Sequence, residues 1–424
     1  MLLVVDTNIL LDYPQIIEDE DNILIITDVL KELDGLKLNT NFDTSFKARR
    51  AAVTIARNLE KLQWNDKFED KHIPVDDKLL EVTKSYGEDG ILITNDIYLK
   101  VKAIIKGVKT KGYGKTESYT GEYTLLVDPN NEAQYQLISD IIQNGVIPEE
   151  LGKIYKNQYL LIKDITQPFK NRHEETDYKI YKILKSNGDK FVDIKEDYEL
   201  RINNIFIDKK GKGIGPRNPE QSCLFDMLLD KDKTIIYAGG KFGTGKSFIL
   251  NNYALQELER GNIQRIVYVP NNAYTENTID IGALPGELLD KVAGQIGPLV
   301  DLIGIDHVHS YIQQGKLEVV NMGSIRGRSF DDTIIIVNEA QNLTEEHIKL
   351  LIGRCGESSR IFFDGDLKQT DSAIFRNRNG LRLLLELRKS PIYSELFGTI
   401  QLKLTERSKT AQASSYLDQI TGGI

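Results

Sequence analysis

Short apolar runs alternate with amphipathic stretches over the first 126 residues. The runs cover residues 2–5, 23–26 and 91–94, and between them apolar positions recur at the spacing of one helix face. Apolar runs this short, separated by helical patterns, are typical of a parallel sheet with helices on both faces. We therefore expect a parallel α/β domain over residues 1–126.

The pattern changes between residues 127 and 213. Two strand-like runs, 178–184 and 190–194, flank the pair Asn187-Gly188, and Asn-Gly between such runs is a strong signal for a β-hairpin. The stretch 209–216 is rich in glycine and lysine, as an exposed linker is. This part of the chain is predicted to be a connector that contains a small β module.

Strand-like runs return in the last part of the chain, which we assign to residues 214–424. They are 234–238, 266–269, 333–337 and 360–363. Helical patterns separate these runs, and no short-period repeat is present. The fold class is therefore α/β, with a second parallel α/β domain at the C-terminal end.

Length and composition agree with this division into domains and indicate the cellular compartment. A chain of 424 residues has room for about three domains. The opening apolar run ends at Asp6, so neither a signal peptide nor a membrane span of ~20 apolar residues is expected. Cys223 and Cys355 are far apart and outside any CxxC spacing, and His307 and His309 have no further ligand near them. We expect a cytoplasmic protein without disulfides or structural zinc.

Charge is unevenly distributed along the chain. The net charge of −9 argues against a protein that coats nucleic acid. Residues 100–115 nevertheless contain six lysines and no acid. This lysine strip is either a solvated helix face or a surface that contacts a phosphate backbone.

The strongest chemical signal is a phosphate-binding loop. The strand-like run 234–238 is followed by the pattern GxxxxGK[ST], and residues 248–254 then open a helix. Glycines let backbone N–H groups surround phosphates at a helix N-terminus, the lysine neutralises the β and γ phosphates, and the serine binds Mg²⁺. The residues expected to hold ATP here are Gly240, Gly243, Thr244, Gly245, Lys246 and Ser247.

An acidic strand end opposite this loop carries an unusual substitution. Nucleotide hydrolases usually have Asp-Glu at this place, but this chain has Asn338-Glu339. Glu339 can still orient or deprotonate the attacking water. Because Asn338 lacks the charge that attracts Mg²⁺, we expect ATP to bind but to be hydrolysed weakly, and we expect Asn338→Asp to raise turnover. Asp366 and Gln369, just past a later strand, are expected to sense the γ-phosphate.

Several of these elements together resemble the PhoH family of ATPases, relatives of superfamily-one RNA helicases. The resemblance covers residues 216 to about 420 and includes Gln221, Leu284-Pro285-Gly286, Ile325-Arg326-Gly327-Arg328, Glu339-Ala340-Gln341-Asn342, and Gly365-Asp366 with Gln369. It implies a P-loop NTPase (RecA-like) domain, adenine contact by Gln221, an arginine finger at Arg354 or Arg407, and a homohexameric ring. Val269-Pro270 departs from the family's Arg-Pro, which removes one polar or phosphate contact.

The N-terminal domain contains four acids at places where a parallel sheet could bring them together. Asp6 and Asp96 follow strand-like runs, while Glu32 and Asp77 lie in helical stretches. Acids at strand ends and adjacent helix starts can share one edge of a sheet. Such a cluster would repel itself without a hard cation, so it implies Mg²⁺ or Mn²⁺. Each acid could instead be a helix cap or a solvated charge.

The acids, together with Asp6-Thr7-Asn8 and Thr94-Asn95-Asp96, resemble a PIN-domain ribonuclease over residues 1 to about 126. The resemblance implies a PIN-like parallel α/β sandwich in which Asp6, Glu32, Asp77 and Asp96 bind the metal, with Asp76 as the substitute for Asp77. Two such ions can activate water and stabilise the leaving oxygen in phosphodiester cleavage. The lysine strip would then hold RNA.

The whole chain therefore resembles a PIN-PhoH fusion. This implies an ATP-dependent RNA helicase that threads single-stranded RNA to a metal-dependent endoribonuclease, with no membrane partner. Two alternatives stay open. One is a nuclease and ATPase that acts on DNA, since no base-reading pattern is present. The other is a nucleic-acid-binding switch that holds ATP with little hydrolysis because of Asn338.

Overall fold

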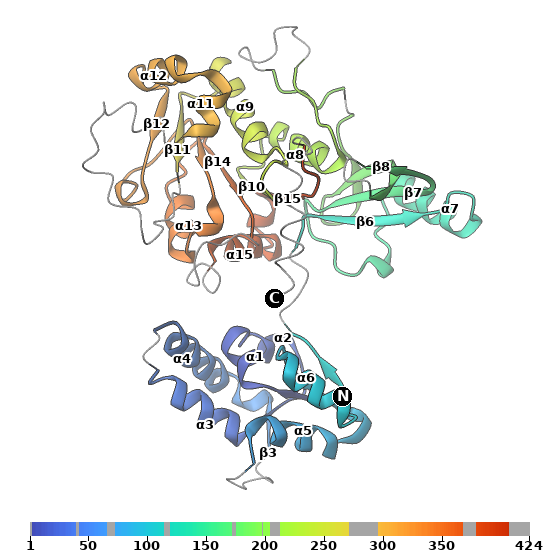
Figure 1. Ribbon diagram of the computed structural model, residues 1–424. Coiled ribbons are helices and arrows are strands. Elements are labelled where there is room, and N and C mark those ends of the chain that lie inside the picture. Colours follow the sequence, from blue (N-terminus) through green and yellow to red (C-terminus); the bar gives the residue numbers. More distant parts are fainter. Residues whose placement is uncertain are drawn as a thin grey trace. The chain divides into compact units, whose positions relative to one another are not determined.

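The computed structural model describes nine stretches of the chain, which form two compact units (Figure 1). The described residues are 2–39, 42–65, 73–113, 119–171, 175–196, 198–203, 213–270, 296–367 and 379–406. Contacts divide the chain between Ser118 and Tyr119.

The first unit has a five-stranded, fully parallel sheet in the order β3-β2-β1-β4-β5. Its strands are β1 (Leu2–Val5), β2 (Ile23–Ile26), β3 (Leu62–Asn65), β4 (Gly90–Ile93) and β5 (Thr110–Lys111). Its helices are α1 (Thr7–Asp12), α2 (Ile16–Asp19), α3 (Thr27–Leu36), α4 (Phe42–Arg57), α5 (Val75–Ser85) and α6 (Ile97–Ile105). Strands β1 and β2 are buried along their whole length, which explains their unbroken apolar runs.

The order of these strands marks the place where a site is expected. The chain passes from β1 to β2 on one side and later adds β4 on the other side of β1. In open parallel sheets, ligands bind outside the carboxyl ends of the strands at such a switch point. The carboxyl ends of β1 and β4 therefore form the edge of the sheet where a ligand is expected.

The second unit begins with a small sheet in the order β6-β7-β8-β9. Its strands are β6 (Glu122–Val127), β7 (Tyr159–Lys170), β8 (Thr176–Ser186) and β9 (Phe191–Asp193), and it carries helix α7 (Glu132–Ser139). The hairpin predicted at Asn187-Gly188 joins β8 to β9, with Ser186 paired to Phe191. Strand β6 pairs with β7. The stretch up to residue 126 that our sequence boundary gave to the N-terminal domain therefore lies partly in the connector sheet.

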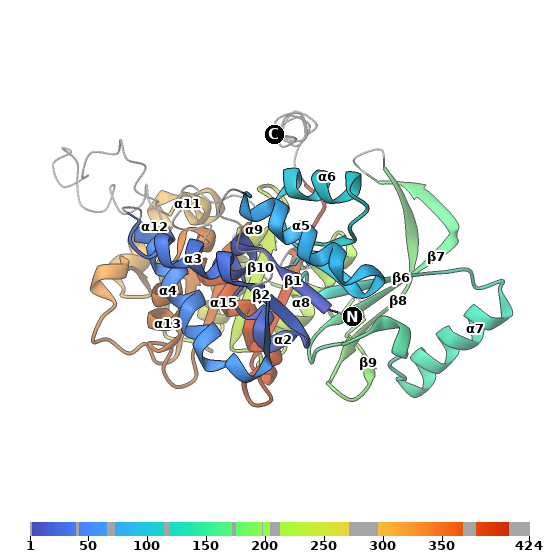
Figure 2. The same cartoon turned by 90° about the horizontal axis from the view of Figure 1, so that it is seen from below.

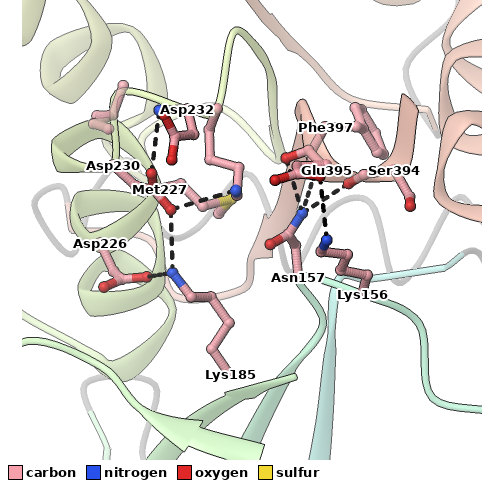
Figure 3. A network of polar contacts seen from close by, with 12 residues as sticks. Lys156, Asn157, Lys185, Asp226, Met227, Asp230, Asp232, Ser394, Glu395 and Phe397 are labelled. Atoms are coloured by element: carbon pink, nitrogen blue, oxygen red, sulfur yellow. Dashed lines mark hydrogen bonds and ion pairs between the residues drawn. The ribbon is translucent and has the colours of Figure 1, made fainter. Parts of the chain in front are cut away.

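Polar contacts fix this small sheet to the rest of the second unit (Figure 3). Asn157 donates through Nδ2 to the carbonyls of Ser394, at 2.7 Å, and Phe397, at 3.0 Å. Lys185 Nζ lies 2.9 Å from Asp226 Oδ2. In both views the β6–β9 sheet lies beside helix α8 (Pro219–Leu229), which carries Asp226 (Figures 1 and 2). The connector is thus part of the larger unit.

The larger sheet of this unit is parallel, in the order β12-β11-β13-β14-β10-β15. Its strands are β10 (Ile235–Gly240), β11 (Arg265–Val269), β12 (Leu317–Val319), β13 (Thr333–Val337), β14 (Arg360–Gly365) and β15 (Phe397–Leu402). The helices, besides α8, are α9 (Lys246–Glu259), α11 (Gly297–Ile303), α12 (Ile305–Gln313), α13 (Glu345–Ile352) and α15 (Gly380–Leu385). Successive strand residues alternate between two cores: Phe362 belongs to one and Phe363 to the other.

The last strand also contacts the segment that leads into the connector. Gln401 N in β15 donates to Thr120 O at 2.8 Å. Beyond β15, Lys403 pairs with Glu122 in β6. The start of the connector and the end of the large sheet are therefore adjacent.

A buried arginine, Arg360, holds the base of the large sheet. Its side chain donates to the carbonyl of Lys233 at 2.9 Å, to that of Leu228 at 2.8 Å and to the hydroxyl of Tyr253 at 2.6 Å. Its guanidinium group lies 5.1 Å from the ring centroid of Phe362. It thereby satisfies carbonyls at the C-terminal end of α8, which have no partner within the helix.

Replacing Arg360 with Met should destabilise the second unit. The change leaves several buried carbonyls without donors, so we expect the free energy of unfolding to fall by about 3 kcal/mol. Urea unfolding followed by circular dichroism measures this. Arg265→Met is the matched control, because Arg265 is about a third exposed and its pair should contribute under ~1 kcal/mol. Equal losses in the two variants would contradict the assignment.

Candidate nucleotide and metal sites

The loop between β10 and α9 has the conformation that a phosphate-binding loop requires. Gly240, Gly243 and Gly245 have φ angles of 140°, 80° and 96°, a region that side chains disfavour. A Cβ atom at Gly240 would also lie 2.5 Å from the carbonyl of Leu402. Helix α9 starts at Lys246, so its first N–H groups face the loop. The strand–loop–helix arrangement expected from sequence is confirmed.

Side chains around the loop hold its backbone in place. Lys246 Nζ donates to the carbonyls of Gly240 at 2.6 Å and Lys241 at 3.0 Å. Thr244, which is fully buried, donates to the same Lys241 carbonyl at 2.9 Å. Gln221 Nε2 donates to Thr244 O at 3.1 Å. Gln221 is therefore placed against the loop, and its contact with adenine stays a prediction.

The chain just beyond β15 also contacts this loop. Glu406 N donates to the carbonyl of Gly243 at 2.8 Å. Its side chain accepts from Asn218 Nδ2 at 2.9 Å, and Asn218 is the residue that caps α8. The phosphate-binding loop is thus connected to both α8 and the end of β15.

Beside the loop, the carboxyl group of Asp364 links the ends of β13 and β14 to the start of α9. Asp364 is 2% exposed and lies near the end of β14. It accepts hydrogen bonds from Ser247 Oγ and, at 3.1 Å, from Glu339 N. With its amide oriented to satisfy its hydrogen-bonding groups, Asn338 donates to the two carboxylate oxygens at 3.0 and 3.2 Å.

The pKa of Asp364 reflects this environment. Burial raises it, while the charge of Lys246 and the hydrogen bond from Ser247 act in the opposite direction. Sequence reasoning did not single out Asp364. The available signal was a carboxylate directly after the apolar run 361–363, inside a strand that is otherwise buried.

Glu339 is held in a strained and well-supported position. Its φ angle is 51°, which is unusual for a residue with a side chain and is often found at functional sites. Gln341 Nε2 donates to Glu339 Oε2 at 2.5 Å, and Gln341 Oε1 accepts from Asp366 N at 3.1 Å. Gln341 therefore connects the two elements that sequence analysis assigned to water activation and γ-phosphate sensing.

Other residues expected at this site have more limited support. Arg354 follows α13, and its Nε has no hydrogen-bond partner among the described residues. Val269 is fully buried, so this position makes no polar side-chain contact. Gln369, Arg407 and Leu284-Pro285-Gly286 lie outside the described residues. The roles of Gln369 and of either arginine stay predictions.

In the first unit, the carboxyl ends of β1 and β4 meet at Asp6 and Thr94. Asp6 is 4% exposed and accepts from Thr94 Oγ1 at 2.8 Å. The same hydroxyl oxygen accepts from Asp96 N at 3.0 Å. Burial raises the pKa of Asp6, and the charges of Asp76 and Asp96 raise it further. Three acids are therefore close enough to interact at the switch point of this sheet.

The remaining two predicted ligands behave differently. Thr7, next to Asp6, donates from its hydroxyl to Glu32, which brings Glu32 toward the same edge. Asp77 instead lies 3.0 Å from Lys106, and this hydrogen bond lowers its pKa. The charge of Asp76 acts on Asp6, so Asp76 stays open beside Asp77 as the predicted ligand at this place.

The chemistry of this edge fits a hard divalent cation. The donors are carboxylates, the ligands that hard divalent cations prefer, and the charges of Asp76 and Asp96 raise the pKa of the buried Asp6. In the part of the chain that the structure describes, no group of three or more His, Cys, Asp or Glu side chains already stands in an arrangement that could hold a metal ion. No ligand shell is therefore formed among the described residues, and Asp6, Glu32, Asp77 or Asp76, and Asp96 stay predicted ligands.

The lysine strip is exposed but largely compensated where it is described. Lys102 lies 3.7 Å from Asp76, and Lys109 lies 3.0 Å from Glu88. With the Lys106–Asp77 pair, these contacts leave less net positive charge than the sequence alone suggests. Lys115 lies outside the described residues.

Fold and site together define the class of protein. A parallel sheet with a phosphate-binding loop between β10 and α9, and with Glu339 at a neighbouring strand end, is a P-loop nucleotide-binding domain. Residues 213–414 match the family model of PhoH-like proteins. Residues 3–114 match the PIN domain. The chain belongs to the PIN-PhoH fusion family.

Two proteins named PhoH2 are similar to this chain. Protein PhoH2 of Bacillus subtilis is 26% identical over 471 residues, which cover 98% of this chain and 99% of the relative. Protein PhoH2 of Mycolicibacterium smegmatis is 31% identical over 235 residues, 53% of this chain and 52% of the relative. Among solved structures, the Pif1 helicase from Candida albicans covers 48% of this chain and is itself covered to 43%, at 16% identity and a TM-score of 0.26, a similarity too low to bear on function.

One further property concerns membranes. Across the described stretches, no helix combines the length and the apolar character needed to span a bilayer.

The acidic edge of the first unit yields a test with matched neighbours. Asp76→Asn should weaken Mn²⁺ binding by about tenfold, because it removes a charge that acts on Asp6, whereas Asp77→Asn removes only a partner of Lys106. Calorimetric titration of the full chain with Mn²⁺ in the absence of nucleotide measures both. A larger effect from Asp77→Asn would restore the original assignment.

Proposed function

We propose that this protein is an ATP-dependent RNA helicase coupled to a metal-dependent endoribonuclease. The observation that carries the proposal is the phosphate-binding loop, with Lys246 and Ser247 at the start of α9 and Glu339 after β13, two strands away from β10 in the sheet. The acidic edge around Asp6, in a unit that matches the PIN domain, adds the nuclease. Family membership supports the combination, and the activities themselves are our proposal.

In the ATPase site, each residue has a distinct task. The loop glycines let backbone N–H groups approach the phosphates, and Lys246 neutralises their charge. Magnesium, when bound, would be held by Ser247 and would offset charge on the transferring phosphoryl group. Glu339, fixed by Gln341, would orient the attacking water. Asp366 and Gln369 would respond to the γ-phosphate, and Gln221 would contact the adenine.

In the nuclease site, the acids of the first unit would hold Mg²⁺ or Mn²⁺. Thr94 and Thr7 orient Asp6 and Glu32, so these carboxylates are positioned before any metal arrives. Asp96 is fixed as the cap of α6, since Leu99 N donates to its Oδ1 at 3.0 Å. Such ions supply an activated water and stabilise the leaving oxygen in phosphodiester cleavage.

Single-stranded RNA in the cytoplasm is the proposed substrate, and a hexameric ring is the proposed assembly. Lys100 and Lys102, on the helix α6 that Asp96 caps, would contact phosphates near the cleavage site. Arg354 or Arg407 would reach the nucleotide of an adjacent subunit, as arginine fingers do. The Nε of Arg354 that lacks a partner among the described residues supports this assignment.

An ATP-dependent switch is the second candidate function. Asn338 in place of the usual aspartate favours a protein that holds ATP and hydrolyses it slowly. Such a protein would bind nucleic acid in a nucleotide-dependent way without processive unwinding. A DNA-directed nuclease and ATPase is the remaining alternative on substrate grounds.

A pair of single variants separates the two activities. Lys246→Ala should reduce ATP turnover by about 10²-fold or more, because the phosphate charge is no longer offset. It should leave Mn²⁺-dependent cleavage of a short, unstructured RNA intact. Asp6→Asn should do the reverse. Phosphate-release and gel assays on the same preparations give both rates.

Matched oligonucleotides test the substrate. Cleavage of RNA at a rate well above that of DNA of the same sequence is the expected result, and equal rates would favour the DNA-directed alternative. If neither variant changed any activity of the folded protein, the enzymatic proposal would be wrong.

A further inference from the structure

We propose that Asp364 supplies, from β14, the carboxylate that Asn338 cannot supply from β13, and that it positions Ser247 for a magnesium ion. The inference rests on the proposed nucleotide site and deepens it by naming a positioning residue. It also removes the reason to expect weak ATP hydrolysis, because Asp364 would supply the negative charge that Asn338 lacks.

Strand register explains how the carboxylate can occupy a neighbouring strand. Val337 pairs with Phe363 across β13 and β14, so Asn338 and Asp364 are the next residues at the same level. On its other side, Asp364 pairs with Ala238 of β10, the strand that leads into the phosphate-binding loop. Position 364 therefore lies one strand nearer to that loop than position 338 does.

The direct contact with Ser247 connects Asp364 to the expected magnesium ligand. Ser247 Oγ donates to Asp364 Oδ2, and a serine at this position of the motif provides the hydroxyl ligand of magnesium. A carboxylate that accepts from this hydroxyl orients the oxygen lone pairs and adds negative charge beside the ion's position. Among the residues described at this site, Asp364 is the acid that Ser247 contacts.

The amide at position 338 complements this carboxylate. Asn338 donates to both oxygens of Asp364, and a second acid in the same place would put two buried carboxylates in contact. Like charges at such a distance cannot both ionise readily. The pair Asn338 and Asp364 thus provides one negative charge and one hydrogen-bond donor. The usual arrangement, with an aspartate at position 338 and a neutral residue at position 364, would provide the same negative charge from the other strand.

Charge around Asp364 agrees with a site for a cation. Lys246 is the positive group whose charge acts on it, while Glu339 adds a further negative charge. The donor set of a hydroxyl and carboxylates suits a hard divalent ion.

Four variants of the full chain test the proposal. They are Asp364→Asn, Asn338→Asp, the double exchange Asn338→Asp with Asp364→Asn, and the control Asp226→Asn, which removes a buried acid that contacts Lys185 rather than Ser247. For each, calorimetry measures the affinity for a non-hydrolysable ATP analogue in excess EDTA and in Mg²⁺. Thermal unfolding without ligand and the rate of phosphate release complete the set.

Asp364→Asn should bind the ATP analogue in EDTA as tightly as the original protein does. The increase in affinity that Mg²⁺ causes should be about tenfold smaller in this variant, and turnover should fall by a similar factor. The double exchange should recover most of this gain, because it restores one carboxylate. Asn338→Asp alone should reduce turnover, opposite to the expectation from sequence, because two acids then compete for one position. Asp226→Asn should lower thermal stability without changing the Mg²⁺ dependence.

Either of two results would overturn the proposal. One is a folded Asp364→Asn variant with unchanged Mg²⁺ dependence, and the other is a folded double exchange that recovers nothing. Failure of the underlying nucleotide site gives a different result, because the original protein would then bind no ATP analogue either in EDTA or in Mg²⁺.

Discussion

The hydrogen bonds that converge on Asp364 are the constraint on which the nucleotide site depends. A buried carboxylate is tolerated only when donors and positive charge surround it. Here the donors come from α9, through Ser247, and from the end of β13, through Asn338 and the backbone of Glu339. Because Asp364 accepts all of these hydrogen bonds, the start of α9 and the residues Asn338 and Glu339 keep a fixed relative position.

The first unit uses the same type of contact at its own sheet edge. Threonine hydroxyl groups orient two of its acids. Thr94, directly after β4, donates to Asp6, and Thr7, next to Asp6, donates to Glu32. Both units therefore place acids at the carboxyl ends of parallel strands and fix them with short hydroxyl groups. Ligands of parallel α/β sheets bind at this edge, so both units carry acids where a bound ligand is expected.

Local pattern was sufficient to predict the two parallel sheets, the phosphate-binding loop and the hairpin at Asn187-Gly188. Each of these is determined by residues that are adjacent in sequence. The contribution of Asp364 was not predictable, because it depends on β14 lying between β10 and β13. The division between Ser118 and Tyr119 was not predicted for a related reason. The sequence of β6 does not show that this strand pairs with β7 in the second unit.

The choice between Asp76 and Asp77 shows a limit of a different kind. Consecutive residues on α5 point about 100° apart around the helix axis. A shift of one position therefore decides which acid acts on Asp6 and which pairs with Lys106. The sequence provided both acids but not the rotation of the helix against the sheet.

The contacts at the end of β15 have a mechanical consequence. Glu406 bonds to Gly243 in the phosphate-binding loop, and only five residues earlier Gln401 bonds to Thr120 at the start of the connector. A tether this short has little slack, so displacement of the loop strains the bond at its far end. The backbone of residues 401–406 therefore joins the phosphate-binding loop to the start of the connector directly, without any intervening side chain.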